Sequence, residues 1–320
     1  MRFKQLTVHL LAPPLLGLCG CAVITQPGVR AIAVTPAAVD AVALERHVRE
    51  LAVTLHPRSY DSQANLQRAG DYVLAQFDGL NARTEIQDVA VDGVIYRNVI
   101  ARFGPAEGPL LVIGAHYDGC GTTPGADDNA SGIAGLLEIA RLLAQHPPPH
   151  PVELVAFTLE EPPYFRTPFM GSAVHARALR NARREVRLMI SLEMIGYFRD
   201  APGSQRYPSR ALGLLYPDRG NFVALVGRLR DFGAMRRVKG LFKGASSLPV
   251  VSINAPASVP GVDFSDHASY WNEGFPALMV TDTAFLRNPN YHGEGDTPET
   301  LDFARMAQVV QAVHAVAMEF

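Results

Sequence analysis

Carboxylate or imidazole side chains follow nearly every buried apolar run of this 320-residue chain. Five of them have types that bind divalent cations: His116, Asp128, Glu161, Glu193 and His292. Burying so many acids together is very costly unless cations compensate their charge. Imidazole and carboxylate ligands favour Zn, Mn or Co over Ca or Mg, and the three cysteines cannot form a thiolate zinc cage.

A two-metal site needs a bridging carboxylate and about two further ligands per ion, with the ions ~3.5–4 Å apart. The five residues meet this requirement, and Glu160 stands beside Glu161 without being needed as a ligand. A metal pair lowers the pKa of a bridging water towards ~7 and polarises a carbonyl oxygen. A free carboxylate can take the proton of that water and pass it to a leaving amine. The residues therefore predict amide hydrolysis.

The elements that must position these side chains are strands that alternate with helices. Short apolar runs predict strands buried on both faces, at 110–115, 152–157, 188–192 and 277–281. Helical spacing predicts helices over 42–55, 62–77, 132–143, 171–183 and 298–320, the last with Thr297 as its N-cap. Two further strands are expected within 84–103, joined by a turn at Asp92-Gly93.

This alternation predicts one doubly wound α/β domain over residues 41–320 with a largely parallel sheet. Ligands of such sheets collect at the carboxyl ends of the strands, where the candidate residues stand. Residues 199–262 are richer in Pro, Gly, Ser and Arg, and are expected to be partly an insertion that forms a lid or substrate wall.

The N-terminus reads as an export signal. Arg2 and Lys4 precede an apolar run at 6–18 that is too short to cross a bilayer, which needs ~20 residues. Residues 18–21 resemble a bacterial lipobox, so that residues 1–21 form the signal and Cys21 becomes the lipidated first residue. A plain secretory signal is the alternative. Either signal predicts an exported protein, periplasmic or anchored to a membrane.

Residues 22–40 are rich in Ala, Val and Pro and are expected to be a linker. Cys120 is then the remaining internal cysteine, expected to be a small, buried or half-buried free thiol. The 29 basic and 31 acidic residues nearly cancel, which disfavours nucleic acid as a partner. A chain that is 48% hydrophobic and 19% charged is not a disordered tail protein.

Six motifs in order resemble the two-zinc aminopeptidases of metallopeptidase family 28. They cover most of residues 110–302: His116-Tyr117-Asp118, Gly125 to Gly132, Glu160-Glu161, Glu193-Met194-Ile195-Gly196, Ser265-Asp266-His267, and His292 before Asp296-Thr297. The resemblance implies a three-layer α/β fold, in which helices flank a mostly parallel mixed sheet, and two zinc ions, with Co or Mn as substitutes.

The resemblance also implies roles by position. One zinc would be held by His116, Asp128 and Glu193, and the other by Asp128, Glu161 and His292, so that Asp128 is the bridge. Glu160 would be the general base and acid. Asp118 would assist catalysis by a hydrogen bond that orients His116. Asp127 would lie beside the bridge without ligating.

The chain departs from the family pattern at three places. Glu193 stands where Asp is frequent, and this extra methylene shifts the geometry of its metal. Residues 162–170 replace a short Gly-containing link and are expected to shape the substrate pocket. The Tyr that some relatives place before Ser-Asp-His is absent, which leaves Tyr270, Tyr291 or the metals to stabilise the oxyanion.

The function that these residues favour is an exported metal-dependent exopeptidase, an aminopeptidase that acts on peptides with a free N-terminus. Its nucleophile would be a hydroxide that bridges the metals. The only membrane contact would be the lipid anchor at Cys21. The alternatives are a glutaminyl cyclase-like enzyme with one zinc, a carboxypeptidase-like relative, and a non-catalytic binding lipoprotein on the same scaffold. His116 argues against the first, and the complete ligand set argues against the last.

Overall fold

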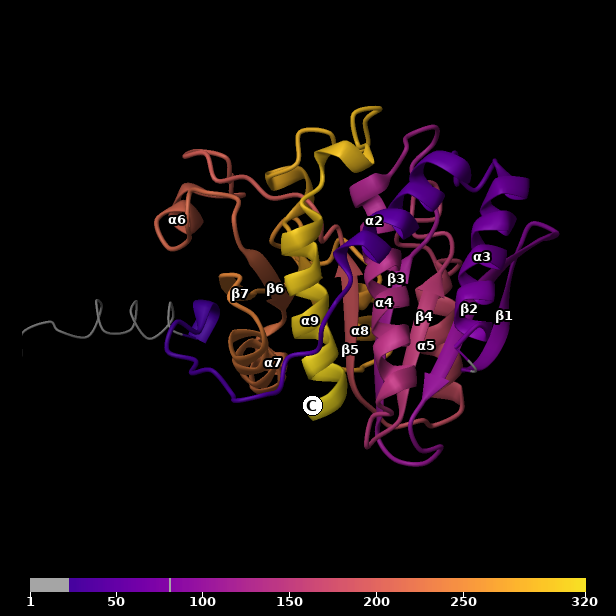
Figure 1. Cartoon of the computed structure of the whole chain (residues 1–320), viewed down its shortest axis with the longest axis horizontal. Helices are drawn as coiled ribbons and strands as arrows, with labels where there is room; N and C mark the ends of the chain where they lie inside the picture. The colour runs from indigo at the N-terminus through magenta and orange to yellow at the C-terminus, as the bar shows by residue number, and fades with distance from the viewer. Residues whose placement is uncertain (1–22, 81) are drawn as a thin grey trace, which may run out of the picture.

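Eight strands form one mixed sheet that runs through the whole protein (Figure 1). The computed structural model describes residues 23–80 and 82–320, so the expected export signal and Cys21 lie outside the described residues. The strands are β1 (Arg83–Val91), β2 (Val94–Phe103), β3 (Leu110–His116), β4 (Val152–Phe157), β5 (Val186–Glu193), β6 (Val223–Gly227), β7 (Val250–Asn254) and β8 (Ala277–Thr281). Their order across the sheet is β1-β2-β4-β3-β5-β8-β6-β7.

The centre of the sheet is parallel. β3 pairs in parallel with β4 and β5, β5 with β8, and β6 with β7, whereas β1, β2 and the β6–β8 pair are antiparallel. The four apolar runs of the sequence are β3, β4, β5 and β8, and nearly all their residues are buried. The predicted turn joins β1 to β2, where Asp92 and Gly93 both have the positive φ that a tight hairpin requires.

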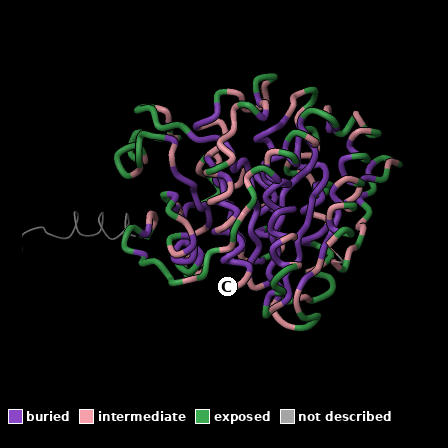
Figure 2. Tube along the Cα trace, viewed as in Figure 1, coloured by how far each residue is buried: buried purple, intermediate pink, exposed green. Residues whose placement is uncertain are grey.

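Helices cover both faces of this sheet and complete the three layers. The α-helices are α2 (Ala41–Arg49), α3 (Gln63–Asp78), α4 (Gly132–Gln145), α5 (Gly171–Asn181), α6 (Arg210–Gly213), α7 (Phe232–Ala245), α8 (His267–Asn272) and α9 (Phe303–Glu319). The helices α2, α3, α4, α7 and α9 pack into one apolar core, while α5 and α8 pack into a second core. Figure 2 shows the buried residues gathered along the central strands and the helices. The predicted three-layer α/β fold is confirmed.

The last helix begins later than predicted. Thr297 and Pro298 open a short 3-10 turn at Pro298–Thr300, and α9 itself starts at Phe303. The carboxylate of Asp302 accepts a hydrogen bond from the main-chain amide of Arg305 and caps α9. Asp302 rather than Thr297 is therefore the N-cap, because its side chain satisfies an amide that the first helical turn leaves free.

Much of the region expected to be an insertion belongs to the sheet. Residues 223–254 supply β6, β7 and the covering helix α7, whereas 199–222 form a loop around the short helix α6. Among the described residues, no helix has both the length and the apolar character needed to cross a bilayer.

Residues 25–32, which we call the N-terminal strap, lie against α7 and β7. Gln26 is 1% exposed, and its side-chain amide donates to Asn254 Oδ1 at 2.6 Å. Lys239 Nζ donates to the carbonyls of Thr25 and Gln26 at 2.8 and 3.0 Å. The amide of Ile32 donates to the carbonyl of Gly240 at 2.9 Å. This part of the expected linker is thus held by specific hydrogen bonds.

Candidate metal centre

The carboxyl ends of the central strands bring the candidate ligands together. His116 and Glu193 are the last residues of β3 and β5, and Glu161 follows β4. Asp128 lies at a kink within Ala126–Ser131, the segment that leads into α4, and its own backbone is not helical. His292 lies in the loop after β8. Because parallel strands end at the same edge of the sheet, side chains far apart in sequence meet there.

Asp128 stands between two groups of ligand atoms. Its Oδ1 lies 3.4 Å from His116 Nε2, which is also 3.4 Å from Glu193 Oε2. Its Oδ2 lies 3.1 Å from His292 Nε2, which is 3.3 Å from Glu161 Oε2. One oxygen of Asp128 therefore faces each histidine, an arrangement that suits a carboxylate shared by two cations.

Unpaired buried atoms show that this cluster fits divalent cations. His116 Nε2, Asp128 Oδ2, Glu161 Oε1 and His292 Nε2 are all buried and have no hydrogen-bond partner among the described residues. Unpaired buried polar atoms are rare in proteins and need an explanation such as an ion. Two imidazoles with three carboxylates form a nitrogen and oxygen donor set that suits zinc and similar metals.

The electrostatics of the cluster also reflect uncompensated charge. Burial and the neighbouring Asp128 raise the pKa of Glu161 to about 7. Burial lowers the pKa of His292, but the nearby carboxylates of Asp128 and Glu161 outweigh it and raise that pKa to about 10. Burial, together with Glu193 and Glu161, raises the pKa of Glu160 well above its usual range. Bound cations would reverse these effects, because they favour the charged carboxylates and neutral imidazoles.

Two further aspartates fix the main chain under the ligands. Asp118 accepts the amides of Glu160 and Glu161 with its two oxygens, at 3.1 and 3.0 Å. Asp296 accepts the amides of Asp127 and Asp128 in the same way, both at 3.0 Å. Each carboxylate thereby orients a pair of adjacent acidic residues.

The expected contact of Asp118 with His116 differs in detail. His116 Nδ1 lies 3.2 Å from the carbonyl oxygen of Asp118 and 3.5 Å from its Oδ1. The main chain of Asp118 thus makes the closer contact with the imidazole, because its side chain is directed at the amides that follow β4. We call the two hydrogen bonds that Asp296 accepts from the amides of Asp127 and Asp128 the Asp296 clamp. In the sequence, the only indication of this role is that Asp296 belongs to the last of the six motifs.

Other expected residues lie around the cluster. The carboxylate of Asp127 accepts hydrogen bonds from the amide of Gly196 and the side-chain amide of Asn288, both at 2.9 Å. The Tyr270 hydroxyl is buried at 2.6 Å from His175 Nδ1, so it is engaged away from the cluster. The ring of Tyr291 stacks on His292 with centroids 3.8 Å apart. Of the two tyrosines considered for the oxyanion, only Tyr291 lies at the cluster.

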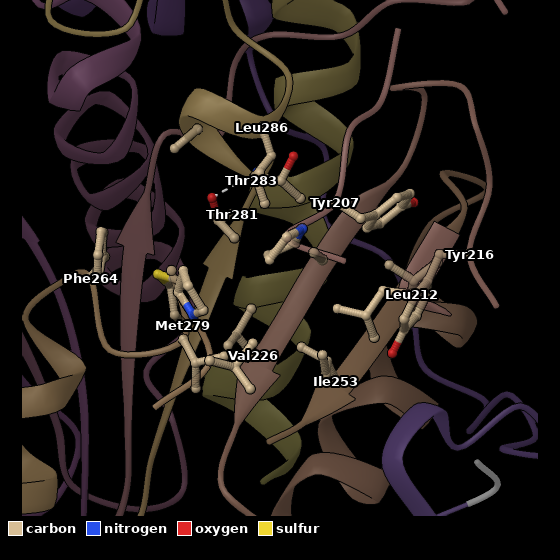
Figure 3. A pocket seen from close by; sticks show the side chains of 18 of the residues that line it. Tyr207, Leu212, Tyr216, Val226, Ile253, Phe264, Met279, Thr281, Thr283 and Leu286 are labelled. Atoms are coloured by element: carbon tan, nitrogen blue, oxygen red, sulfur yellow. Dashed lines mark hydrogen bonds between the residues drawn. The ribbon is translucent and has the colours of Figure 1, made fainter. Parts of the chain in front are cut away.

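An apolar cavity begins beside Glu193 (Figure 3). Three strands contribute its floor: Val226, Ile253 and Met279. Loops and two short helical segments contribute its walls: Tyr207, Leu212, Tyr216, Phe264 and Leu286. Part of the region expected to be a substrate wall, residues 207–216, thus lines the cavity. The sequence did not identify the floor residues, because apolar side chains that line a cavity have the same pattern as core residues.

The unusual segment 162–170 packs against this wall through Phe165. Its Phe165 ring packs edge-on against Phe264, with centroids 5.9 Å apart, and Phe264 lines the apolar cavity. The Phe264 ring in turn packs against the Phe285 ring, with centroids 5.9 Å apart, and the Phe285 ring packs against the Tyr291 ring, with centroids 5.7 Å apart. A row of aromatic rings therefore links the segment after Glu161 to the candidate ligand His292.

Cys120 also lies at the cluster, which sequence reasoning missed. Its Sγ and the ligand atoms of Glu161 and His292 all lie within 4.8 Å of one another. Burial, with Glu161 and Asp128 nearby, raises the pKa of the thiol to about 12. Without a cation the thiol is therefore neutral, which argues against a cysteine nucleophile. The only sequence signal was its position four residues after His116.

The fold and the site together are those of a metal-dependent exopeptidase. The model of peptidase family M28 matches residues 98–220. The chain is 52% identical over 296 residues to the uncharacterized protein YfbL of Escherichia coli K12, which covers 90% of this chain and 91% of that protein. The chain belongs to peptidase family M28.

More distant relatives include aminopeptidases, and solved structures share the fold. Leucine aminopeptidase 1 of Ajellomyces dermatitidis is 25% identical over 284 residues, which cover 83% of this chain and 68% of that protein. LapB from Legionella pneumophila shares the fold with a TM-score of 0.69 and 24% identity, over 87% of this chain and 71% of that one. A glutaminyl cyclase from Bacteroides thetaiotaomicron shares the fold with a TM-score of 0.66 and 18% identity, over 89% of this chain and 100% of that one.

Proposed function

We propose that this protein is an exported zinc aminopeptidase with two metal ions per chain. The observation that carries the proposal is the position of Asp128, whose two oxygens face two separate imidazoles at 3.4 and 3.1 Å. His116, Asp128 and Glu193 would hold one ion, and Asp128, Glu161 and His292 the other. When bound, such a pair makes a water molecule acidic and polarises the carbonyl of a peptide bond.

Glu160 is the residue that moves the proton. Its Oε2 lies 3.9 Å from His116 Nε2, and the side chain is almost completely buried. Asp118 holds its main-chain amide, so the carboxylate is directed to the cluster from a fixed backbone. A general base in this place takes the proton of the attacking water and donates it to the leaving amine. Burial keeps the carboxylate away from competing solvent.

The apolar cavity beside Glu193 would take the side chain of the N-terminal residue of the substrate. Its floor and walls are apolar or aromatic, with a few polar groups such as Thr281 and Gln205 at the edge. A cavity of this kind favours large apolar side chains. The name of the relative leucine aminopeptidase 1 agrees with this preference.

The solved glutaminyl cyclases make acyl transfer the second candidate. The two reactions differ in what they require of the site. Acyl transfer of that kind was expected to use one zinc, whereas this chain retains both groups of ligands around Asp128. The complete double set favours hydrolysis.

A panel of aminoacyl-chromogenic substrates tests the proposal. We expect cleavage of substrates with a free α-amine and a large apolar side chain, and no cleavage of their N-acetylated forms. A chelator should abolish turnover, and metal analysis should find about two zinc equivalents per chain. Equal cleavage of blocked and free substrates would contradict an aminopeptidase. Cyclisation of N-terminal glutamine without hydrolysis would favour the second candidate.

The proposed location is the outer face of a bacterial membrane, through a lipid on Cys21. The support is the sequence of residues 1–21, with its charged start, short apolar run and lipobox-like end. Metabolic labelling with a fatty acid should mark the full chain and not the Cys21→Ala variant. Labelling of both proteins, or of neither, would contradict the lipid anchor.

A further inference from the structure

Cys120 lies beside one of the two candidate metal sites. Its Sγ is within 4.8 Å of the ligand atoms of both Glu161 and His292. It is the free cysteine of the described residues, and none of the roles given above uses it. The position of this thiol beside two candidate ligands is therefore not explained by the roles given above.

The neighbouring side chains give independent evidence for a cation at this point. Glu161 is 4% exposed, and its Oε1 has no hydrogen-bond partner among the described residues. His292 Nε2 lies 3.1 Å from Asp128 Oδ2 and 3.3 Å from Glu161 Oε2. The sulfur therefore lies beside two side chains that already converge on this point. Zinc binds sulfur, imidazole nitrogen and carboxylate oxygen in one tetrahedral shell.

The loop that carries Cys120 is rigidly held. The buried guanidinium of Arg58 donates to the carbonyls of Tyr117, Pro124 and Gly125 at 3.0, 3.0 and 2.9 Å. The carbonyl of Cys120 itself accepts the Thr123 hydroxyl at 2.8 Å. Because Arg58 is bound to carbonyls on both sides of the loop, Cys120 is positioned before any metal arrives. Ligands on a preformed backbone are a general feature of metal sites that bind tightly.

We propose that Cys120 is a fourth protein ligand of the cation held by Asp128, Glu161 and His292. This inference rests on the proposed function in one respect, namely that a divalent cation binds there. On binding, the S–H bond breaks, the proton goes to solvent, and the sulfur forms a bond to the metal as a thiolate. Four protein ligands would complete a tetrahedral set, so a water shared with the other cation would be the fifth ligand of this one.

The consequence is that the two cations are not equivalent. The site of His116, Asp128 and Glu193 has three protein ligands and keeps an open position, which is typical of a catalytic site. The site with Cys120 would have one more protein ligand, and that ligand is soft. Soft thiolates select zinc or cobalt over manganese and magnesium. Cys120 would thus decide which metal the second site accepts.

Cobalt spectroscopy on the full chain tests this assignment. In a protein with Cys19→Ala and Cys21→Ala, Cys120 is the sole thiol, so any sulfur-to-cobalt charge-transfer band in the near ultraviolet must come from it. We expect this band when the metal-free protein is titrated with Co2+, and its loss in Cys120→Ser. His116→Asn is the matched control, because it removes a ligand of the other cation and should keep the band, whereas His292→Asn should lose it.

Metal selectivity provides a second measurement. Cys120→Ser should weaken zinc binding by about tenfold or more, with a much smaller change for Mn2+. Two bound cobalt ions without a sulfur band would overturn the role of Cys120 and leave the proposed function intact. Failure of the unmodified protein to bind any divalent cation would instead contradict the proposed function itself. A sulfur band that survives in His292→Asn and disappears in His116→Asn would place Cys120 on the cation held by His116, and would overturn the proposed assignment.

Discussion

Arg166 and Asp263 form an ion pair that joins two loops beside the apolar cavity, with Arg166 Nη2 2.5 Å from Asp263 Oδ1. Arg166 belongs to the segment that follows Glu160 and Glu161, and Asp263 precedes Phe264. The guanidinium also lies over the Phe165 and Phe264 rings, at 5.2 and 4.8 Å from their centroids. The ion pair and the two rings therefore hold Phe264 in the wall of the cavity.

Breaking this ion pair should change substrate selection more than stability. The Arg166 side chain is 50% exposed, so the pair contributes about 0.2–1 kcal/mol at most to folding. Arg166→Ala should raise the KM for substrates with large apolar N-terminal residues severalfold and change kcat less. The exchanged pair Arg166→Asp with Asp263→Arg should restore much of the KM. Arg180→Ala, at an exposed position of α5, is the control, and an equal rise in its KM would contradict the role of the pair.

The clamp by Asp296 should control metal affinity. Asp296→Asn keeps one acceptor oxygen and loses the other, so the amide of Asp127 or Asp128 loses its partner. A residue that orients a ligand typically changes metal affinity by about 10–100-fold when substituted. Competition with a chromophoric chelator measures this loss, and the surface substitution Glu299→Gln is the control. Unchanged zinc affinity in a folded Asp296→Asn protein would show that the clamp is dispensable.

Substitutions of the adjacent residues Glu160 and Glu161 should have different effects, the first on turnover and the second on metal binding. Glu160→Gln keeps the ligands and removes the base, so turnover should fall by about 10²–10⁴-fold while the metal content is unchanged. Glu161→Gln should lose metal from one site, since it removes a ligand. Kinetics combined with elemental analysis distinguish the two. Full activity of Glu160→Gln would reject its assigned role.

His267 should make stability depend on pH in the acid range. Its pKa is lowered from 6.5 to about 4, mainly by burial and further by the charge of Arg228. The hydrogen bond to the carbonyl of Val262 acts in the opposite direction and raises the pKa, but by less. The unfolded chain takes up the proton first, so stability is constant above about pH 6.5 and falls between 6.5 and 4. Relative to the wild type, His267→Gln should reduce this fall by an amount on the order of 3 kcal/mol.

Urea unfolding at several pH values, with chelator in both proteins, measures this difference. Asp266 and Arg228 remain in both proteins, so their titration cancels in the comparison. Parallel stability curves for wild type and His267→Gln from pH 7 to 4 would show that the imidazole titrates normally.

Gly244 should be required for the N-terminal strap. A Cβ at this position would meet the main chain of Ile32, whereas a Cβ at Gly233 on the same helix would meet nothing. Gly244→Ala should therefore cost about 1–3 kcal/mol and make residues 23–40 more sensitive to protease. Gly233→Ala should be neutral or slightly stabilising, because alanine favours a helix. If the two variants unfold alike in urea and are cleaved alike, the strap does not depend on this contact.

Much of the fold is local in origin, and for that reason the sequence predicted it. Strands buried on both faces read as continuous apolar runs, and β3, β4, β5 and β8 appear where such runs stand. Two of the five candidate ligands, His116 and Glu193, end strands, and the other three lie in segments that connect strands and helices. Since parallel strands end at one edge, their convergence follows from the topology.

The start of α9 and the fate of residues 23–32 and 223–254 were decided by the tertiary structure. Asp302 rather than Thr297 caps α9, and a segment of linker-like composition is bound through its carbonyls to Lys239. Composition describes which side chains a segment has. It does not describe the hydrogen bonds that another element offers to its main chain.

The sequence alone determined the class of chemistry, because it contains the imidazoles, the carboxylates and their order along the chain. Only the tertiary structure decided that Asp296 clamps the Asp128 backbone, that Cys120 faces Glu161 and His292, and that Phe264 is held by Arg166. Each of these relationships joins residues from separate loops. Their distances depend on how the loops pack over the sheet, and no spacing along the chain encodes that packing.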